Sequence, residues 1–75
     1  MQIRFSRHAK RRAELYGIPE TTVLHLLSHA KFDPGKHEIV QDIEGFKYPI
    51  KIVVAVEDDI LTVVSSYPLK KGRKA

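Results

Sequence analysis

The sequence predicts an α+β domain, a two-layer sandwich in which two helices pack on one face of a small, mainly antiparallel sheet. Apolar residues recur at helical spacing in two short segments of the first half, and they alternate with polar residues in the second half. Two turn signals divide that second half into three strands. Because no linker or repeat interrupts the chain, residues 1–75 are expected to form one domain of order β-α-α-β-β-β.

The first strand is expected over residues 3–5, and a helix follows it directly. Ser6 is a typical N-cap and Gly17 is a typical left-handed stop, which predicts a helix of about ten residues. At about 100° per residue, its buried stripe consists of Ala9, Ala13 and Tyr16. The opposite side of this helix carries Arg7, Lys10, Arg11 and Glu14.

A second helix is expected to begin at Pro19 and Glu20 and to extend to about Ala30. Proline fits the first turn of a helix, and an acidic residue there interacts favourably with the helix dipole. Its apolar face comprises Val23, Leu24, Leu27 and Ala30. The turn residues of the segment 32–35 then end the helical half.

Glu44-Gly45 is the expected tip of the first of two hairpins. With a two-residue loop, Ile39 pairs with Ile50 on the face that the helices cover. Opposite charges then meet across the other face, in the pairs Asp42 with Lys47 and Glu38 with Lys51. Turn, pleat and charge therefore agree on one register, which a four-residue loop in place of the two-residue loop would shift.

Asp58-Asp59 is the expected tip of the second hairpin. Its register places Tyr67 opposite Ile50 on the helix-covered face, together with the pairs Ile52–Ser65, Val54–Val63 and Val56–Leu61. The other face is expected to leave an apolar patch uncovered, formed by Val40, Val53, Ala55, Ile60, Thr62 and Val64. A large exposed patch of this kind is typical of a surface that binds a partner.

Composition excludes several functional classes. The chain has no cysteine, which excludes disulfides and thiolate zinc sites and favours the cytoplasm. It has no apolar run long enough to span a membrane and no signal peptide pattern. No glycine-rich phosphate loop or nucleophile elbow is present, and no cofactor is expected. His25 and His29 have metal-ligand spacing but no local third ligand, so no metal site is predicted.

The net charge of +4 is concentrated at the two ends of the chain. Residues 4–12 hold Arg4, Arg7, Lys10, Arg11 and Arg12, and the basic tail, residues 70–75, which is expected to be flexible, holds Lys70, Lys71, Arg73 and Lys74. Such clusters favour binding to phosphate or to an acidic protein. A solvated helix face and a frayed tail produce the same pattern, so both interpretations stay open.

His8 and Arg12 lie one helical turn apart, beside the buried stripe of the first helix. A basic residue at such a position lays its stem on apolar surface and needs a partner for its head group. The pair is therefore either a structural tether between helix and sheet or part of a binding or catalytic site.

The motif His8-Ala9-x-x-Arg12 followed by Gly17-Ile18, together with the closing segment 62–68, resembles a small family known as domain of unknown function 4258. Through that family the chain also resembles toxins of the RelE/ParE fold, the BrnT branch in particular. The resemblance covers residues 3–69. It implies a RelE-like fold, RNA or the ribosome as a partner, and an antitoxin that would cover the open sheet face. The implied activity is that of a ribonuclease or a translation inhibitor.

RNA cleavage by a 2′-hydroxyl requires a base, an acid and cations beside the phosphate. A metal-independent endoribonuclease would use His8 as base or acid, Arg12 as phosphate ligand and the Tyr67 hydroxyl beside them. The residues that would hold the RNA backbone are Arg4, Lys70, Lys71 and Arg73. Two alternatives remain, a non-catalytic module that binds nucleic acid or protein, and a structural homodimer joined through the open sheet face.

Overall fold

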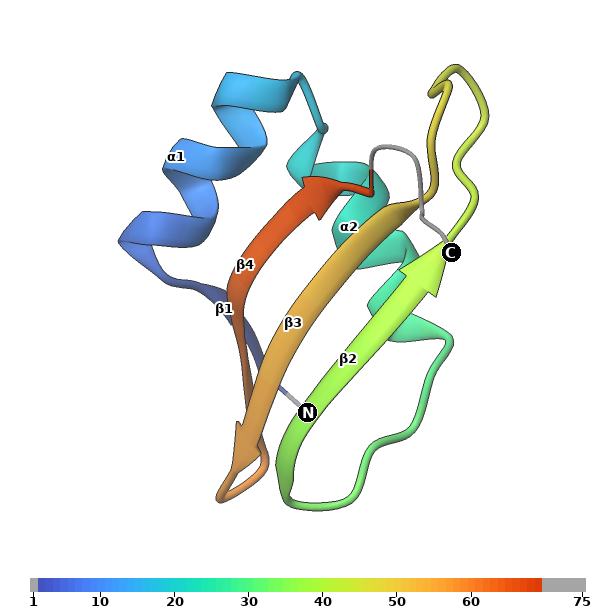
Figure 1. Cartoon of the computed structure of the whole chain (residues 1–75). Coiled ribbons are helices and arrows are strands. Elements are labelled where there is room, and N and C mark those ends of the chain that lie inside the picture. Colours follow the sequence, from blue (N-terminus) through green and yellow to red (C-terminus); the bar gives the residue numbers. More distant parts are fainter. Residues whose placement is uncertain (1, 70–75) are drawn as a thin grey trace.

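The computed structural model describes residues 2–69 and confirms the predicted α+β class and element order (Figure 1). The elements are β1 (Gln2–Phe5), α1 (Arg7–Tyr16), α2 (Glu20–Ser28), β2 (Gly35–Gln41), β3 (Ile50–Glu57) and β4 (Ile60–Pro68). The second helix thus ends two residues earlier than predicted. The predicted basic tail, residues 70–75, lies outside the described residues. None of the helices in residues 2–69 is long and apolar enough to cross a membrane.

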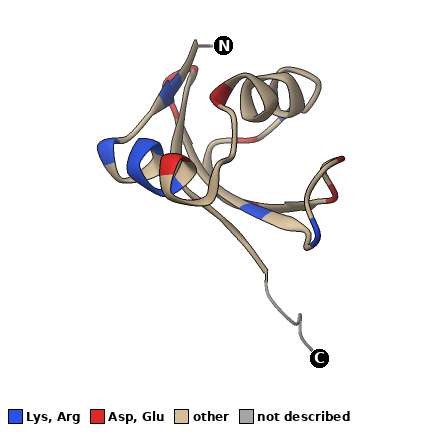
Figure 2. Ribbon diagram, turned by 90° about the horizontal axis from the view of Figure 1, so that it is seen from above, with Lys and Arg blue, Asp and Glu red and all other residues tan. Residues whose placement is uncertain are grey.

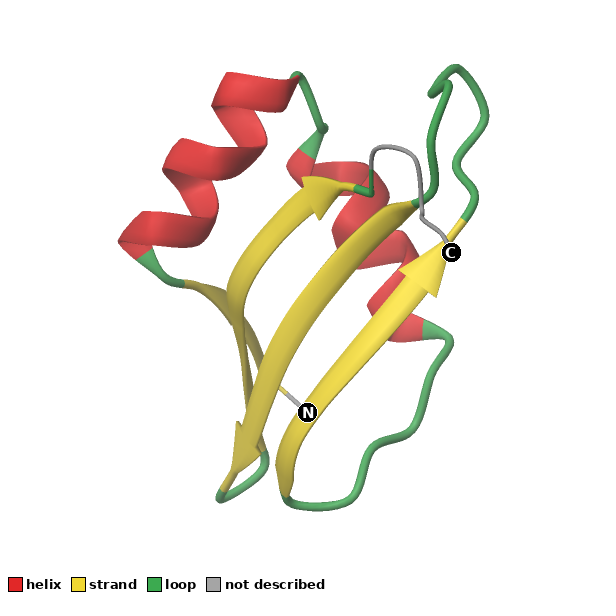
Figure 3. Cartoon of the chain, viewed as in Figure 1, coloured by secondary structure: helices red, strands yellow, loops and turns green. Residues whose placement is uncertain are grey.

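The strands form one mixed sheet of order β1-β4-β3-β2, in which β1 is parallel to β4 and the other neighbours are antiparallel. Both helices pack on the same face of this sheet, because alternate residues of β3 and β4 join residues of α1 and α2 in one core (Figure 3). That core comprises Ala9, Ala13, Ile18, Val23, Leu27, Ile50, Ile52, Val54, Val56, Leu61 and Val63. The opposite face of the sheet is not covered by any described element.

The start of α1 is fixed to the sheet by its cap. The Ser6 hydroxyl accepts a hydrogen bond from the Ala9 amide at 3.0 Å, as predicted for an N-cap. The same hydroxyl donates to the carbonyl of Val64 at 3.1 Å, and the Ser6 amide donates to the carbonyl of Val63 at 3.0 Å. One residue therefore both begins the helix and holds it against β4.

The end of α1 is a Schellman motif. Gly17 has a left-handed φ of 68°, and its amide donates to the carbonyl of Glu14 at 3.3 Å. The Ile18 amide donates to the carbonyl of Ala13 at 2.8 Å, and both of these side chains are buried. This tight reversal brings the chain into α2 within three residues, which places the first turn of α2 beside the second half of α1 (Figure 1).

The predicted register of the first hairpin is wrong by two residues. The tip forms where predicted, because the Phe46 amide donates to the carbonyl of Ile43 at 3.0 Å around Gly45, which has a φ of 93°. However, residues 42–49 form a longer loop, so Ile39 pairs with Ile52 instead of Ile50. A shift of two residues keeps every side chain on its predicted face.

The second hairpin has the predicted tip but a different register at its far end. Asp58 and Asp59 have φ values of 51° and 63°, which is the geometry of a type I′ turn. Val54 pairs with Val63 as predicted, but a β-bulge follows, and beyond it Lys51 pairs with Tyr67. An extra residue in one strand exchanges the faces of the residues that follow.

Tyr67 is consequently on the open face, which corrects the prediction that it faces the helices. Ser66 takes the inner position opposite Ile52 and is 1% exposed. The Lys51 ammonium lies 2.9 Å from the Glu38 carboxylate, so this predicted ion pair forms. The two residues are diagonal neighbours on β3 and β2 rather than directly opposite each other as predicted. The hydrogen bond to Glu38 raises the pKa of Lys51, burial opposes this shift, and the neighbouring Tyr67 hydroxyl reinforces it.

The raised pKa of Lys51 predicts a loss of stability in alkaline solution. Because the pKa is higher in the folded protein, the contribution of Lys51 is complete below its ordinary value of 10.5 and is lost as the pH rises through the folded value. Thermal unfolding of the wild-type protein and of Lys51→Met between pH 9 and 12 measures this difference. The two melting temperatures should converge in this range, and a constant difference would contradict the assignment.

Candidate nucleic-acid interface

The outward side of α1 carries a row of exposed charged residues, and Figure 2 marks the basic and acidic positions along this helix. Ala9 and Ala13 bury the opposite side of the helix against the sheet, so the helical period directs this row into solvent. Its members are Arg7, Lys10, Arg11 and Glu14, all of them exposed. The first helix therefore presents three cations and one carboxylate on one surface.

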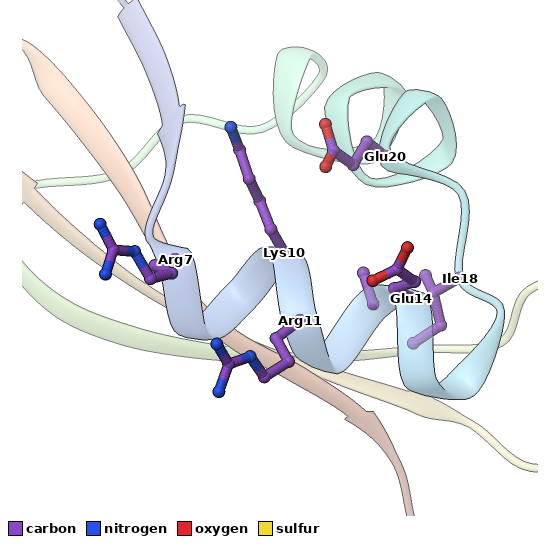
Figure 4. A pocket seen from close by; sticks show the side chains of 7 residues that line it. Arg7, Lys10, Arg11, Glu14, Ile18 and Glu20 are labelled. Carbon is purple, nitrogen blue, oxygen red and sulfur yellow. The ribbon is translucent and has the colours of Figure 1, made fainter.

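This surface is hollowed where α1 meets the start of α2. The hollow has a volume of about 520 Å³ and is lined by Arg7, Lys10, Arg11, Ala13, Glu14, Ile18 and Glu20. Figure 4 shows the three cations on the first half of α1, Glu14 on its second half, and Glu20 across from them on α2. Its volume is within the range of small-ligand pockets, about 300–1,000 Å³.

The charges of the hollow are not neutralised by one another. The single ion pair within residues 2–69 joins Lys51 and Glu38, which lie on the other side of the sheet from the hollow. Lys10 and Glu14 have the spacing of a helix ion pair, but their charged atoms are not within ion-pair distance. The hollow therefore has cationic and anionic groups that are available to a ligand.

His8 and Arg12 lie on the flank of α1 that faces away from the hollow. At about 100° per residue, they fall on one side of the buried stripe, and Lys10 and Glu14 fall on the other. His8 is exposed and Arg12 is half-buried. Neither side chain takes part in a hydrogen bond or an ion pair within residues 2–69, so the structure does not show them as tethers.

The structure does not gather the predicted catalytic residues in one cavity. Tyr67 lies on the open sheet face beside Lys51, while His8 and Arg12 belong to α1. None of these three residues lines any of the four main hollows in the described part of the chain. Binding is therefore better supported by the geometry than catalysis.

Arg4 is separated from the cations of α1. It lines a smaller hollow of about 210 Å³ near the β3–β4 turn, where Glu57 and Asp58 are its charged neighbours. Two carboxylates beside a single guanidinium reduce its attraction for phosphate. The other predicted backbone ligands, Lys70, Lys71 and Arg73, lie outside the described residues.

The open sheet face carries the apolar residues that the sequence predicts there. Val40 is 54% exposed at the edge strand β2, and the more central members of the patch are half-buried, namely Val53, Ala55, Ile60, Thr62 and Val64. The pairing of β2, β3 and β4 makes these residues neighbours. This surface is a second place at which a partner can bind.

The remaining histidines have local contacts. The rings of His25 and His29 lie 4.6 Å apart in an edge-on arrangement on α2. His37 Nε2 lies 2.7 Å from the carbonyl oxygen of Asp33, and the residue pairs with Val54, two positions from its predicted partner Ile52. No group of three histidine or acidic residues suited to a metal ion occurs within residues 2–69.

Sequence reasoning missed Glu14 and Glu20 as members of one site. It placed Glu14 on the outward side of α1 and treated Glu20 only as a favourable residue for a helix start. The available signal was the short connection between the helices, because Gly17, Ile18 and Pro19 leave too little chain to separate the two carboxylates widely. The angle between the helices, which forms the hollow, depends on packing.

The chain was compared with protein-family models, with curated proteins and with solved structures, and none of the three comparisons found a match.

Proposed function

We propose that this protein binds RNA through the outward side of α1, in the manner of a small basic toxin-family protein. The observation that carries the proposal is the row formed by Arg7, Lys10 and Arg11 around an open hollow. These three cations are exposed, and none of them forms an ion pair with another described residue. Phosphate groups of a nucleic acid are the anions that such a row neutralises best, since they repeat along the chain.

The chemistry of these three cations favours the phosphates of a nucleic acid, rather than the carboxylates of a flexible acidic protein, as their ligand. Arg7 and Arg11 present planar guanidinium groups that bind phosphate oxygens in pairs, and Lys10 adds a mobile point charge between them. The residues are four apart or fewer on one helix, so their backbone positions are held rigidly. A rigid row costs little conformational entropy beyond that of the side chains when it binds.

The proposal assigns the open sheet face to a protein partner, which in a toxin–antitoxin pair is the antitoxin. The exposed Val40 and the half-buried Val53 and Val64 support this assignment, because apolar surface of this kind is stabilised by a partner. Sedimentation of the purified protein at two concentrations separates this from the alternative of a homodimer. A monomer at both concentrations agrees with the assignment, and a dimer whose formation is prevented by Val53→Lys contradicts it.

RNA binding is tested by fluorescence anisotropy with a short labelled single-stranded RNA and the full chain. We expect saturable binding that unlabelled RNA reverses and that weakens as the salt concentration rises. Polyglutamate of the same length serves as the competing polyanion. Absence of binding, or displacement by polyglutamate as readily as by RNA, would refute the proposed function.

RNA cleavage is a second candidate activity, and the exposure of His8 beside the half-buried Arg12 favours it. One helical turn brings the imidazole and the guanidinium within reach of the same phosphodiester. In this activity His8 takes the proton of the attacking 2′-hydroxyl, and Arg12 holds the charge that develops on the phosphate. The 2′-oxygen bonds to phosphorus as the bond to the 5′-oxygen breaks, the protonated His8 or water gives that leaving oxygen its proton, and a 2′,3′-cyclic phosphate remains.

Incubation of the protein with messenger RNA, alone and with ribosomes, tests this candidate. If the wild-type protein cleaves RNA, we expect His8→Ala and Arg12→Ala to abolish cleavage, while RNA binding by His8→Ala persists. His25→Ala is the matched control, because it removes an exposed histidine from α2. Unchanged cleavage by both α1 variants would remove these residues from the mechanism.

A further inference from the structure

The hollow between α1 and α2 has opposite charges at its two ends. Arg7, Lys10 and Arg11 arise from the first half of α1, whereas Glu14 and Glu20 approach the hollow from the end of α1 and the start of α2 (Figure 4). A site that only bound a phosphate backbone would be weakened by these carboxylates, since they repel phosphate. Their presence points to a ligand that carries both an anion and hydrogen-bond donors.

We propose that this hollow binds a guanine nucleotide, with its phosphate on the cations and the donor edge of the base on Glu14 and Glu20. The proposal deepens the RNA-binding function and rests on it, because it names the base that the α1 surface selects. It adds a means of base discrimination, which the phosphate contacts alone do not supply.

The phosphate end of the site follows from the helix geometry. Arg7 and Arg11 are four residues apart and Lys10 lies three residues after Arg7, so all three side chains start from the outward side of α1. Their head groups diverge in Figure 4, so binding one phosphate requires that these exposed side chains turn toward it. Figure 4 shows Lys10 extending from α1 toward α2, across the hollow. This position allows its ammonium to contact either the phosphate or the carbonyl oxygen of a bound base.

The base end of the site is selective because ionised carboxylates only accept hydrogen bonds. Guanine has two adjacent N–H donors on its Watson–Crick edge, which match the two oxygens of one carboxylate. Adenine and cytosine have one amino group beside a ring acceptor, and uracil has one N–H between two carbonyl oxygens, so each of them places an acceptor against the acid. Glu14 and Glu20 therefore favour guanine over the other three bases.

The floor of the hollow is closed by apolar side chains. It includes Ala13 and Ile18, which are 2% and 3% exposed and are held together by the Schellman motif at the end of α1. These two side chains close the bottom of the hollow between the charged ends but expose almost no surface of their own. A base seated over this floor keeps its edge free for hydrogen bonds.

The test compares the affinities of short single-stranded RNAs that differ at one central nucleotide. We expect guanosine to bind about tenfold more tightly than uridine, since a two-bond contact to a base edge discriminates by about 1–3 kcal/mol. An RNA with inosine at this position lacks the 2-amino donor and should bind roughly fivefold more weakly than the RNA with guanosine. The double variant Glu14→Gln/Glu20→Gln should bind all of these RNAs with similar affinity, and no more weakly than the wild-type protein binds uridine.

The matched control is Glu44→Gln, which removes an exposed carboxylate from the loop 42–49 and should leave the tenfold preference unchanged. Competition with free guanosine monophosphate distinguishes a guanine within RNA from a free nucleotide as the ligand, since displacement at equal concentration identifies the free nucleotide. Equal binding of all four bases by the wild-type protein overturns the guanine site while leaving RNA binding intact. If the wild-type protein binds none of these RNAs, the proposed function itself is refuted.

Discussion

Ile52→Ala should lower the free energy of unfolding by about 3 kcal/mol. Ile52 is 0% exposed at the centre of β3, where it faces the helices and lies opposite Ile39 and Ser66 on the neighbouring strands. The truncation removes buried apolar surface and leaves a cavity that neighbouring strands cannot close. A domain of 75 residues has little stability to lose, so the variant should be partly unfolded near body temperature.

Urea denaturation followed by circular dichroism measures this loss, with Val40→Ala as the control. Val40 has the same β-branched chemistry but is 54% exposed on the open face, so its truncation should change the unfolding free energy by about 0.5 kcal/mol or less. A comparable loss in both variants would mean that the open face is as buried in solution as the inner face, which would contradict the monomeric two-layer arrangement.

The helical half of the fold was predictable because its signals are local. Ser6 and Gly17 fix the two ends of α1 through contacts with residues at most four positions away in the helix. The outward direction of Lys10 and Arg11 follows from the helical period alone. In such a segment the residues that decide the conformation are close together in the sequence, so the conformation can be predicted from it.

The sheet was less predictable because strand register depends on features that have no local signature. The first hairpin closes over residues 42–49 rather than over two residues, and Pro49, which has no amide hydrogen, directly precedes β3. The bulge in β4 moves Tyr67 from the inner to the open face, and it is recognisable only from the pairing with β3. The faces of residues before the bulge were nevertheless correct.

The candidate site was only partly predictable for the same reason. His8 and Arg12 could be placed beside the buried stripe, but their position on the flank opposite the hollow depends on the side from which α2 approaches α1. Glu20 joins this site because the chain reverses tightly at Gly17. Contacts between elements, rather than the properties of either helix, therefore create the surface on which the proposed function depends.

The triple variant Arg7→Gln/Lys10→Gln/Arg11→Gln should bind single-stranded RNA about 100-fold more weakly at about 0.1 M salt. Each phosphate contact releases counterions and contributes about 0.7 to the slope of log affinity against log salt concentration. All three residues are exposed, so their replacement by glutamine should leave the thermal unfolding transition almost unchanged. A stable fold with weakened binding would assign the effect to the lost charges.

The matched control is Lys31→Gln/Lys36→Gln/Lys47→Gln, which removes three exposed cations from other parts of the surface. Both triple variants have the same net charge, so long-range attraction falls equally in the two proteins. Only the α1 variant is expected to lose direct phosphate contacts.

The salt dependence of RNA affinity for the wild-type protein and for these two triple variants tests most directly whether α1 contacts the RNA backbone. The slope should fall by about 2 for the α1 variant and stay near the wild-type value for the control. Equal slopes for the two triple variants would show that α1 makes no specific phosphate contacts and would contradict its assignment as the nucleic-acid interface.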